Sequence, residues 1–577
     1  MKDKFLLPLL AAAAFALGSA GAGWDLPSRE RSSKLLPAAW DRSALFDGLT
    51  SGWENIYDKA AGSTPLAAEA AGKYSTKLTG RRDEDFNRPL PPPELWNSYR
   101  SMMIRSGYPD EALPLSDLAR MKPADFDLRP PSFLYGGGYL YPLGAYYSVL
   151  SLTRLAHPLP LREALERPDT LGRIYLAGRL LSAAAFAAVC LLVFLIAREL
   201  QPTAAIYAWA AVMTLPLPGV YAHYLTPHLW SAAWGLTGIY FALCALPDLR
   251  RGPLLAAGAC LGMATASYWS AANAAVLALA VILSPGRSAL KPAALKNLGL
   301  AALAGAAVFL LMNPYLPFNL AEAAAELAPG GASAPAATGN TLPTLFLSAL
   351  PAAAGPAFAF LLPAGCLWGL FSGRPPLRNL SAAVLLLAAP IAFTITPDFP
   401  VGVRRFFPWL TAGALCGSLL MDRLTRDLRP ALRLAALIAA LAPGLGMSLV
   451  YTLSFLDGSG DNSAYKRMAA RLDSIPPGAV LGLTEFPQPA YYPAFRMDRW
   501  RLRLANPETM SALPAADLPE YMLVYYRHKP PLSGILSSRY ALDSAFYPRA
   551  IAGFSPSTLI GGGNPPAELY RLKKEPR

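Results

Sequence analysis

Two adjacent acidic residues in a polar segment could act as proton acceptors in an enzyme. The segment Tyr108-Pro109-Asp110-Glu111 places these two carboxylates well after the first apolar segment of the chain. A positioned carboxylate can serve as a general base, and its hard oxygens also suit a divalent cation such as Mg²⁺ or Mn²⁺. The alternative is that both residues only cap the helix that follows. Asp25 and Glu30 stand closer to the first apolar segment, at the expected membrane boundary.

Cationic and imidazole side chains in other polar turns could bind an anion. Arg179 stands at one end of an apolar segment, His223 and His228 share one turn, and Arg404 and Arg405 precede a late apolar segment. A guanidinium can bind a phosphate through two parallel hydrogen bonds. Arg179 could equally reach lipid headgroups, and the two histidines could simply lie at the interface. The sequence contains no Gly-rich phosphate loop and no metal-finger spacing.

The elements that must position these residues are apolar. Hydrophobic residues make up 54% of the 577 positions and charged residues only 15%. This leaves too few polar residues to cover the surface of a soluble protein of this length. The net charge of +13 comes from basic residues spread over short turns. Membrane orientation explains this distribution, so we expect no nucleic-acid partner. All five cysteines fall within apolar segments, which excludes a disulfide framework in the soluble parts.

The apolar pattern predicts a polytopic α-helical membrane protein. About 11 segments are long enough to cross about 30 Å of hydrocarbon. They lie at 1–20 and near 174–197, 203–222, 228–246, 253–268, 270–284, 297–314, 343–371, 380–396, 406–421 and 432–452. If each crosses once, every turn on the cytoplasmic side carries arginine or lysine, as the positive-inside rule requires. The first segment could alternatively be a cleaved signal peptide.

Residues 138–157 are also apolar and aromatic, but counting them as a span would move the basic turns outside. We therefore expect an amphipathic or shallowly inserted helix on the outer face. The chain then divides into a first transmembrane helix (1–20), an extracytoplasmic loop with amphipathic helices (21–172), a multi-spanning domain (173–455) and an extracytoplasmic soluble domain (456–577). We expect an integral protein of a bacterial inner membrane, in contact with membrane lipid.

The last domain begins at a glycine-rich polar linker, residues 457–462. A helical period over 464–472 and two buried strands, at 478–483 and 521–526, predict a small α/β domain. This domain shows no catalytic motif of its own.

Several segments, taken in order, resemble a known family. They are the Asp-Glu motif, the tyrosine-rich stretch 135–142, Arg179-Leu180-Leu181-Ser182, and residues 222–228, 262–268 and 404–408. This succession is similar to the GT-C membrane glycosyltransferases. In particular it is similar to the family 39 group, which is related to protein mannosyltransferases and bacterial aminoarabinose transferases. The likeness covers roughly residues 1 to 420. It departs from the family at Pro227-His228, where Pro-Asp is common, and at Pro27-Ser28-Arg29-Glu30, where the family usually has its acidic motif.

The resemblance implies transfer of a sugar from a polyprenyl-phosphate-linked donor to a protein, lipid or glycan acceptor on the outer face. The reaction would be a direct, inverting displacement with Asp110, Glu111 or Glu30 as general base. The donor phosphate would be held by a set of basic residues: Arg179, His223, His228, Arg404 and Arg405. No cofactor is required, although a divalent cation on Asp110 and Glu111 stays open.

Three other interpretations are kept beside this one. A transporter or lipid flippase predicts charged residues within the spans and broken helices repeated in two halves, and neither pattern is evident. A ligase or polymerase of surface polysaccharide is a second alternative, and a membrane scaffold that carries the outer domain is a third. A scaffold predicts that the loop carboxylates can be replaced without consequence.

Overall fold

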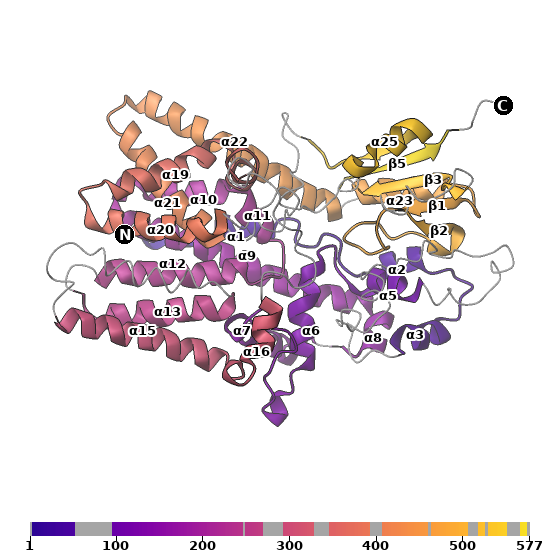
Figure 1. The fold of residues 1–577 in the computed structure, drawn as a ribbon, viewed down its shortest axis with the longest axis horizontal. Helices are drawn as coiled ribbons and strands as arrows, with labels where there is room; N and C mark the ends of the chain where they lie inside the picture. The colour runs from indigo at the N-terminus through magenta and orange to yellow at the C-terminus, as the bar shows by residue number, and fades with distance from the viewer. Residues whose placement is uncertain are drawn as a thin grey trace.

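The structure is a computed structural model that describes residues 3–51, 95–157, 159–245, 249–268, 292–327, 345–392, 407–459, 463–505, 510, 517–525, 529–550 and 566–573. Apolar helices occupy one end of the molecule, and short helices with a mixed sheet occupy the other (Figure 1). The first loop and the C-terminal domain therefore share one end, as their predicted placement on the same side of a membrane requires.

The apolar end is a helical bundle. Its helices are α1 (Asp3–Ser19), α9 (Pro168–Leu200), α10 (Ala205–Thr214), α11 (Pro216–Tyr221), α12 (His228–Ala245), α13 (Arg251–Ser267), α15 (Pro292–Met312), α18 (Leu350–Ala354), α19 (Pro356–Leu370), α20 (Pro375–Ala392), α21 (Phe407–Thr425) and α22 (Pro430–Ser459). Among the described residues, α9, α15 and α22 are long and apolar enough to cross a membrane, and a bent pair would add a fourth crossing. The predicted helical membrane architecture is confirmed at this level. The number of spans stays a prediction, and the predicted span at 270–284 lies outside the described residues.

Two predicted spans are broken. Within 203–222, α10 ends at Thr214 and α11 begins at Pro216, whose missing N–H suits the first position of a helix. Within 343–371, Leu347–Ala354 and Pro356–Leu370 meet at an angle of 100°. The bend is at Gly355, which has φ 80° and lies so close to Gly444 of α22 that a Cβ would come within 2.7 Å of its Cα atom.

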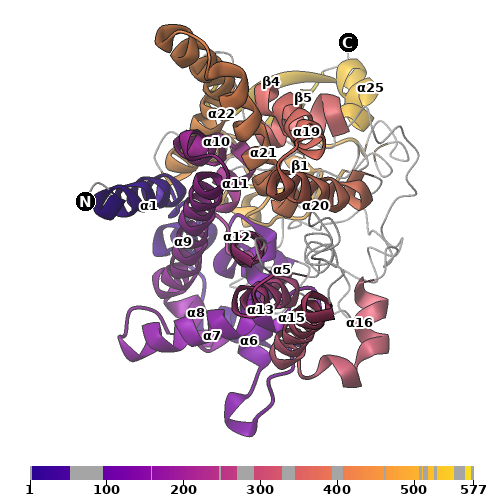
Figure 2. The ribbon, with the colours of Figure 1, turned by 90° about the vertical axis from the view of Figure 1, so that its left-hand side faces the viewer.

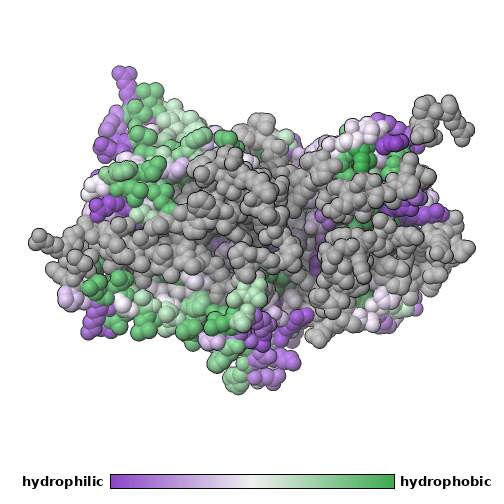
Figure 3. Space-filling model, viewed as in Figure 1, coloured by the Kyte–Doolittle hydropathy of each residue, from purple (hydrophilic) through white to green (hydrophobic). Residues whose placement is uncertain are grey.

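Large apolar side chains are exposed on the bundle. On α15, Leu303 and Leu311 are exposed, and on α22 so are Leu434 and Ile438. Hydrophobic residues gather over these two helices on the face drawn in Figure 3. An apolar surface of this kind fits contact with lipid rather than water.

The tyrosine-rich segment forms α7 (Gly137–Leu152). The two views show α7 running crosswise to α12, α13 and α15 (Figures 1 and 2). Its start is held against the bundle, because a Cβ at Gly136 or Gly137 would collide with a carbonyl oxygen of Ala266 or Met312. This is the orientation expected of a helix that lies along a membrane surface.

Short helices build the rest of the first loop. They are α2 (Arg29–Leu35), α3 (Arg42–Thr50), α5 (Trp96–Ile104), η3 (Pro109–Glu111), α6 (Ala112–Arg120), η4 (Pro123–Asp125) and α8 (Leu161–Glu166). Ser28 begins α2 by accepting a hydrogen bond from the Arg31 backbone N–H, and Asp41 begins α3 in the same way.

The C-terminal domain is a five-stranded mixed sheet with the order β2-β1-β3-β5-β4. Its elements are α23 (Ala464–Asp473), β1 (Val480–Leu483), η9 (Met497–Arg499), β2 (Arg501–Leu504), β3 (Tyr521–Tyr525), α25 (Lys529–Arg539), β4 (Tyr540–Phe546) and β5 (Ala567–Leu572). Strands β1, β2 and β3 are parallel, whereas β5 runs antiparallel to both β3 and β4. The predicted helix and both predicted strands are present. The predicted linker begins later than expected, because α22 continues through Asp457 to Ser459.

One hydrophobic core joins the first loop to the C-terminal domain. Leu35, Tyr99 and Leu165 of the loop belong to the same cluster of buried residues as Leu481 and Leu569 of the sheet. The two predicted outer segments therefore pack as a single unit, which we call the outer unit (described residues of 21–172 and 463–573).

Candidate active site at the junction of bundle and outer unit

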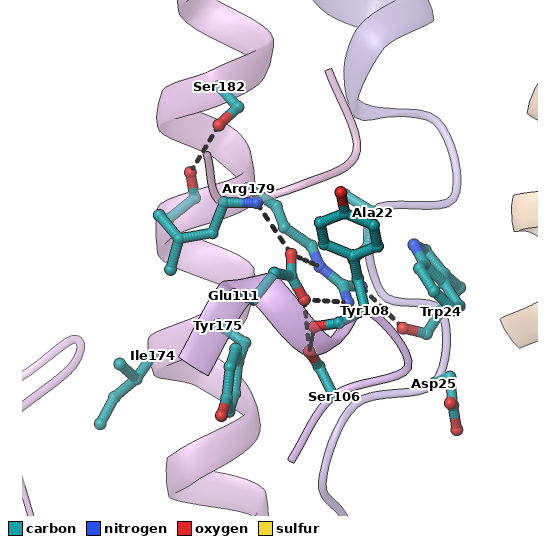
Figure 4. Close-up of polar contacts among 12 residues, drawn as sticks. Ala22, Trp24, Asp25, Ser106, Tyr108, Glu111, Ile174, Tyr175, Arg179 and Ser182 are labelled. Atoms are coloured by element: carbon teal, nitrogen blue, oxygen red, sulfur yellow. Dashed lines mark hydrogen bonds and ion pairs between the residues drawn. The ribbon is translucent and has the colours of Figure 1, made fainter. Parts of the chain in front are cut away.

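A buried ion pair forms the centre of the candidate site. Arg179 of α9 donates from Nε to Glu111 Oε1 and from Nη2 to Glu111 Oε2, each at 2.8 Å (Figure 4). Both side chains are 0% exposed. The pair is a bidentate arrangement, which is the strongest geometry for a guanidinium and a carboxylate.

The ion pair connects four segments of the chain. Arg179 Nη1 donates to the carbonyl oxygens of Ala22 at 2.8 Å and Trp24 at 2.6 Å, just beyond α1. Glu111 Oε1 also accepts from the Leu225 backbone N–H at 2.8 Å, and Oε2 accepts from the Ser106 hydroxyl. The guanidinium lies over the Trp24 ring, 4.7 Å from its centroid. The pair thus fixes the turn after α1, the end of η3, α9 and the turn before α12 to one another.

These contacts bear on the predicted roles of Glu111 and Arg179. Glu111 accepts four hydrogen bonds, which is about the full capacity of a carboxylate. It therefore has no lone pair left for a substrate proton or a cation, and its side chain does not cap α6. Arg179 already neutralises Glu111 instead of facing an open anion site. Catalysis by Glu111 and phosphate binding by Arg179 stay untested predictions. The geometry favours a structural role for both residues, in which they hold the surrounding segments in place.

Asp25 lies beside this ion pair, and nearby cations offset the burial of its carboxylate only in part. Its side chain is 16% exposed, and its Oδ2 atom is buried without a hydrogen-bond partner among the described residues. The backbone of Asp25 is left-handed, with φ 44°. Gly107 packs against it so closely that a Cβ there would lie 2.4 Å from Asp25 Oδ2. Burial raises the pKa of Asp25, and the nearby Arg31 and Arg179 only partly oppose that rise.

A cavity of about 390 Å³ opens beside Asp25, between the first loop, the start of α9 and the C-terminal domain. Its charged lining residues are Asp25, Glu30, Arg31, Lys34, Asp169, Arg173 and Lys466. Arg31 Nη1 donates to the Asp25 carbonyl at 3.3 Å and lies 3.7 Å from its carboxylate. The cavity therefore offers both a carboxylate and several cations to a polar ligand.

Glu30 lies on the outer rim of this cavity. Its side chain is 62% exposed, and Oε1 lies 2.7 Å from Lys34 Nζ and 3.9 Å from Lys466 Nζ of the C-terminal domain. Its carboxylate is exposed to solvent and pairs with lysine, so it lacks the water-poor surrounding that would favour a general base. Its role as a base stays a prediction that this position does not favour.

Asp110 follows Tyr108, whose hydroxyl lies 3.5 Å from Asp110 Oδ2. The Tyr108 ring stacks on Tyr224, with centroids 3.9 Å apart and an interplanar angle of 5°. Tyr221 meets both of these rings edge-on. Asp110 is therefore placed beside an aromatic group at the top of the bundle, and its predicted role as a base remains open.

The aromatic group continues to His228. Its ring lies 4.9 Å from Tyr221, 4.7 Å from Tyr268 and 5.7 Å from Phe407, measured between centroids. Phe407 is the first residue of α21 and follows Arg405 by two positions in sequence. Arg404 and Arg405 themselves lie outside the described residues.

His223 does not face an anion site. Its Nε2 lies 2.7 Å from the Ala20 carbonyl oxygen and its Nδ1 lies 2.8 Å from that of Gly219. The ring also stacks on Phe455, with centroids 4.1 Å apart. Both ring nitrogens are thus engaged with backbone oxygens, so phosphate binding by His223 is an untested prediction that the geometry does not favour.

The predicted divalent cation does not fit the described residues. No group of three or more His, Cys, Asp or Glu side chains among them could hold a metal ion. Both oxygens of Glu111 already accept hydrogen bonds from Arg179. We therefore derive no step through a cation at Asp110 and Glu111.

The sequence reasoning named Asp25 without giving it a role. Its nearness to the end of α1 was visible, but its burial also depends on Gly107, which meets Trp24 and Asp25 only in the folded chain. The sequence feature that could have indicated Asp25 as a catalytic candidate is its position within a few residues of the first membrane helix.

No protein-family model and no curated protein sequence matches the chain. Among solved structures it is similar to ArnT from Cupriavidus metallidurans in the apo state, with a TM-score of 0.44 and 14% identity over 80% of this chain and 93% of that chain. The same protein bound to undecaprenyl phosphate gives 0.43 and 12%, with the same coverage. Archaeal oligosaccharyltransferase AglB from Archaeoglobus fulgidus, in complex with an inhibitory peptide and a dolichol-phosphate, gives 0.39 and 13% over 96% of this chain and 75% of that chain. These are low-identity similarities to GT-C glycosyltransferases, and membership of family 39 stays a prediction.

Proposed function

We propose that the chain is a membrane glycosyltransferase that moves a sugar from a polyprenyl-phosphate donor to an acceptor on the outer face. The observation that carries the proposal is the state of Asp25. Its carboxylate lines a cavity, its Oδ2 has no partner among the described residues, and its backbone is left-handed. A strained and poorly compensated carboxylate weakens the fold, and such groups concentrate at active sites.

The position of Asp25 suits a reaction between a lipid-linked and a polar substrate. It follows α1 of the apolar bundle and borders a cavity lined by α23 of the outer unit. A donor anchored in the bilayer would approach from the bundle, and a polar acceptor would approach from the outer unit. Sequence motifs that resemble GT-C enzymes support the same assignment.

The proposed chemistry is a single displacement. Asp25, or Asp110 beside the aromatic group, accepts the proton of an acceptor hydroxyl. At the same time the oxygen of that hydroxyl bonds to the anomeric carbon of the sugar. The bond from that carbon to the phosphate oxygen breaks, and its electron pair leaves with the polyprenyl phosphate. One displacement inverts the anomeric centre, and the base contributes about 10²–10⁴-fold.

The leaving phosphate needs positive charge. We assign this role to Arg404 and Arg405, together with His228, because Arg179 is committed to Glu111. Phe407 supports the assignment, since it contacts His228 and begins the helix that these arginines precede. Preorganised cations stabilise a developing anion best where water is scarce.

The test is consumption of radiolabelled polyprenyl-phosphate sugars by the purified chain in lipid nanodiscs, with mixed acceptors. We expect the native chain to consume at least one donor and Asp25→Asn to lose this activity. Asp110→Asn tests the second candidate base. Glu166→Gln, at an exposed position of α8, is the matched carboxylate control and should retain activity.

Two results would count against the proposal. One is failure of the native chain to consume any donor with any acceptor. The other is equal activity of Asp25→Asn, Asp110→Asn and the control. A flippase would instead move labelled lipid across a vesicle bilayer without consuming it, so the two functions give different products.

A further inference from the structure

A small hairpin projects from the outer unit near the bundle. It follows α6, and its two sides are joined at Lys122 and Asp127, with Lys122 N donating to Asp127 O at 2.8 Å and Asp127 N donating to Lys122 O at 3.1 Å. Figures 1 and 2 show this segment, between α6 and α7, protruding from the molecule on the side of α7 and α15. It lies near the outer ends of α13 and α15.

The hairpin presents a phenylalanine at its tip. Phe126 is 91% exposed, and its backbone is left-handed with φ 57°. A bulky aromatic residue rarely adopts that conformation, and a water-exposed ring gains nothing from it. Both features are explained if the ring is buried in a surrounding that is not part of this chain.

Neighbouring elements are exposed and apolar in the same way. Phe318, in the turn η6 (Leu316–Phe318), is 88% exposed, and Leu320 begins α16 (Leu320–Leu327). Val149 and Leu152 of α7 are exposed at helical spacing, on the face opposite the buried Leu143 and Tyr147. A helix that is apolar on both faces must bury the second face as well.

Specific contacts hold these pieces in one surface. The Tyr141 hydroxyl of α7 donates to the Leu128 carbonyl at 3.2 Å, just after the hairpin. Arg129 pairs with Glu322 of α16 at 2.5 Å and lies over the Phe133 ring. The tip is thus attached to α7 on one side and to α16 on the other, so it is fixed in position relative to the bundle.

We propose that the hairpin tip with Phe126, together with Phe318, inserts into the outer leaflet of the membrane. Lipid is favoured over a protein partner because this surface continues the exposed leucines of α15 at Leu310 and Leu311. The exposed cation Lys122 stands at the base of the tip, where it can meet lipid phosphates while the ring enters the acyl boundary.

The insertion goes beyond the proposed sugar transfer, because it assigns a lipid contact to residues far from the carboxylates. It would hold the outer unit at a fixed depth relative to the headgroups. A lipid-linked substrate would reach the cavity beside Asp25 at that depth. The inserted tip would therefore determine how the cavity is placed relative to this substrate.

The test places an environment-sensitive fluorophore on single introduced cysteines in the full chain. Phe126→Cys and Phe318→Cys are labelled and reconstituted into phosphatidylcholine and phosphatidylglycerol vesicles. Leu542→Cys on β4 is the matched control, since Leu542 is also exposed but lies in the outer sheet. The native chain treated with the same fluorophore measures the background from its own cysteines, which are buried except for the half-buried Cys244.

We expect emission from positions 126 and 318 to shift to the blue and to be quenched by nitroxide-labelled lipids, while position 542 is quenched by aqueous iodide. Unfolding temperatures equal to that of the native chain show that the variants fold. Quenching of both sites by iodide alone would overturn the proposal. Efficient energy transfer between labelled copies, without lipid quenching, would assign the surface to a second copy and overturn it as well.

Discussion

At the scale of single residues, the Asp25 carboxylate should oppose stability while it supports activity. Because burial raises its pKa above the ordinary value of 3.8, the folded chain holds this proton more tightly than the unfolded chain does. Stability from this group is therefore present at low pH and is lost as pH rises through the interval between the unfolded and folded pKa values. Activity should rise over the same interval, since only the ionised form accepts a proton.

Asp25→Asn should separate these two effects. We expect a loss of about 10²–10⁴-fold in kcat/KM. We also expect a higher unfolding temperature near pH 7, because the amide carries no charge to bury. The measurement is a pair of pH profiles, one of unfolding temperature and one of rate, for Asp25→Asn and for Glu166→Gln. An Asp25→Asn variant that is both active and unchanged in its pH profile of stability would contradict this prediction.

The Glu111–Arg179 pair should be structural. Arg179→Met leaves a buried, unpaired carboxylate and should cost about 3–5 kcal/mol of unfolding free energy. The double variant Glu111→Met with Arg179→Met removes both charges and should recover much of that loss. A double-mutant cycle on denaturation in detergent measures the coupling. If the two losses of unfolding free energy simply add, the side chains act independently and the predicted structural role of the pair is wrong.

The residues around this pair show where sequence reasoning stopped. The types and approximate places of Asp110, Glu111 and Arg179 were predictable. Their pairing was not, because Glu111 and Arg179 are separated by a long stretch of chain and the turn holding Leu225 comes later still. Whether a buried charged residue is catalytic or structural depends on its interaction partners, and tertiary contacts determine those partners.

At the scale of elements, the helices α13 and α15 are held together by backbone contact. A Cβ at Gly258 would lie 2.0 Å from the Ala301 carbonyl oxygen, and one at Gly262 would lie 2.2 Å from that of Gly305. Small residues spaced four apart let two membrane helices approach this closely and gain dispersion energy. The same two helices support α7, so their spacing sets the position of the outer surface.

Gly258→Val should therefore disrupt the pair. The added methyl groups collide with backbone, which cannot move aside like a flexible side chain, and we expect a loss of about 1–3 kcal/mol or more. Thermal unfolding in detergent measures it. Gly252→Ala is the matched control on the same helix, because a Cβ there meets nothing within 4 Å. Equal unfolding temperatures for the two variants would show that the close approach does not contribute.

Element types were largely predictable, and their continuity was not. Long apolar runs and the buried strands near Leu481 and Leu523 gave the right kind of structure. The bend at Gly355 was missed because glycine and proline also occur within straight membrane helices. The glycine-rich stretch after Asp457 suggested a linker, but α22 continues to Ser459 despite the low helix propensity of Gly458.

At the scale of the whole molecule, the outer unit should depend on both of its halves. A chain ending at Ser459 lacks the sheet that covers Leu35, Tyr99 and Leu165. We expect its first loop to be cleaved by added protease under conditions where the full chain resists. A chain ending at Lys573 is the control and should behave like the full chain. Equal resistance of the two shortened chains would show that the loop folds without the sheet.

The shared core also has a consequence for the order of synthesis. The first loop leaves the ribosome long before residues 463–573, yet its buried side chains are completed by them. Strand β5, among the last residues made, is inserted between β3 and β4 and closes the sheet. Contacts so distant in sequence form late. During synthesis the loop must therefore remain with its apolar surface uncovered until residues 463–573 follow, and only then can the outer unit reach its native state.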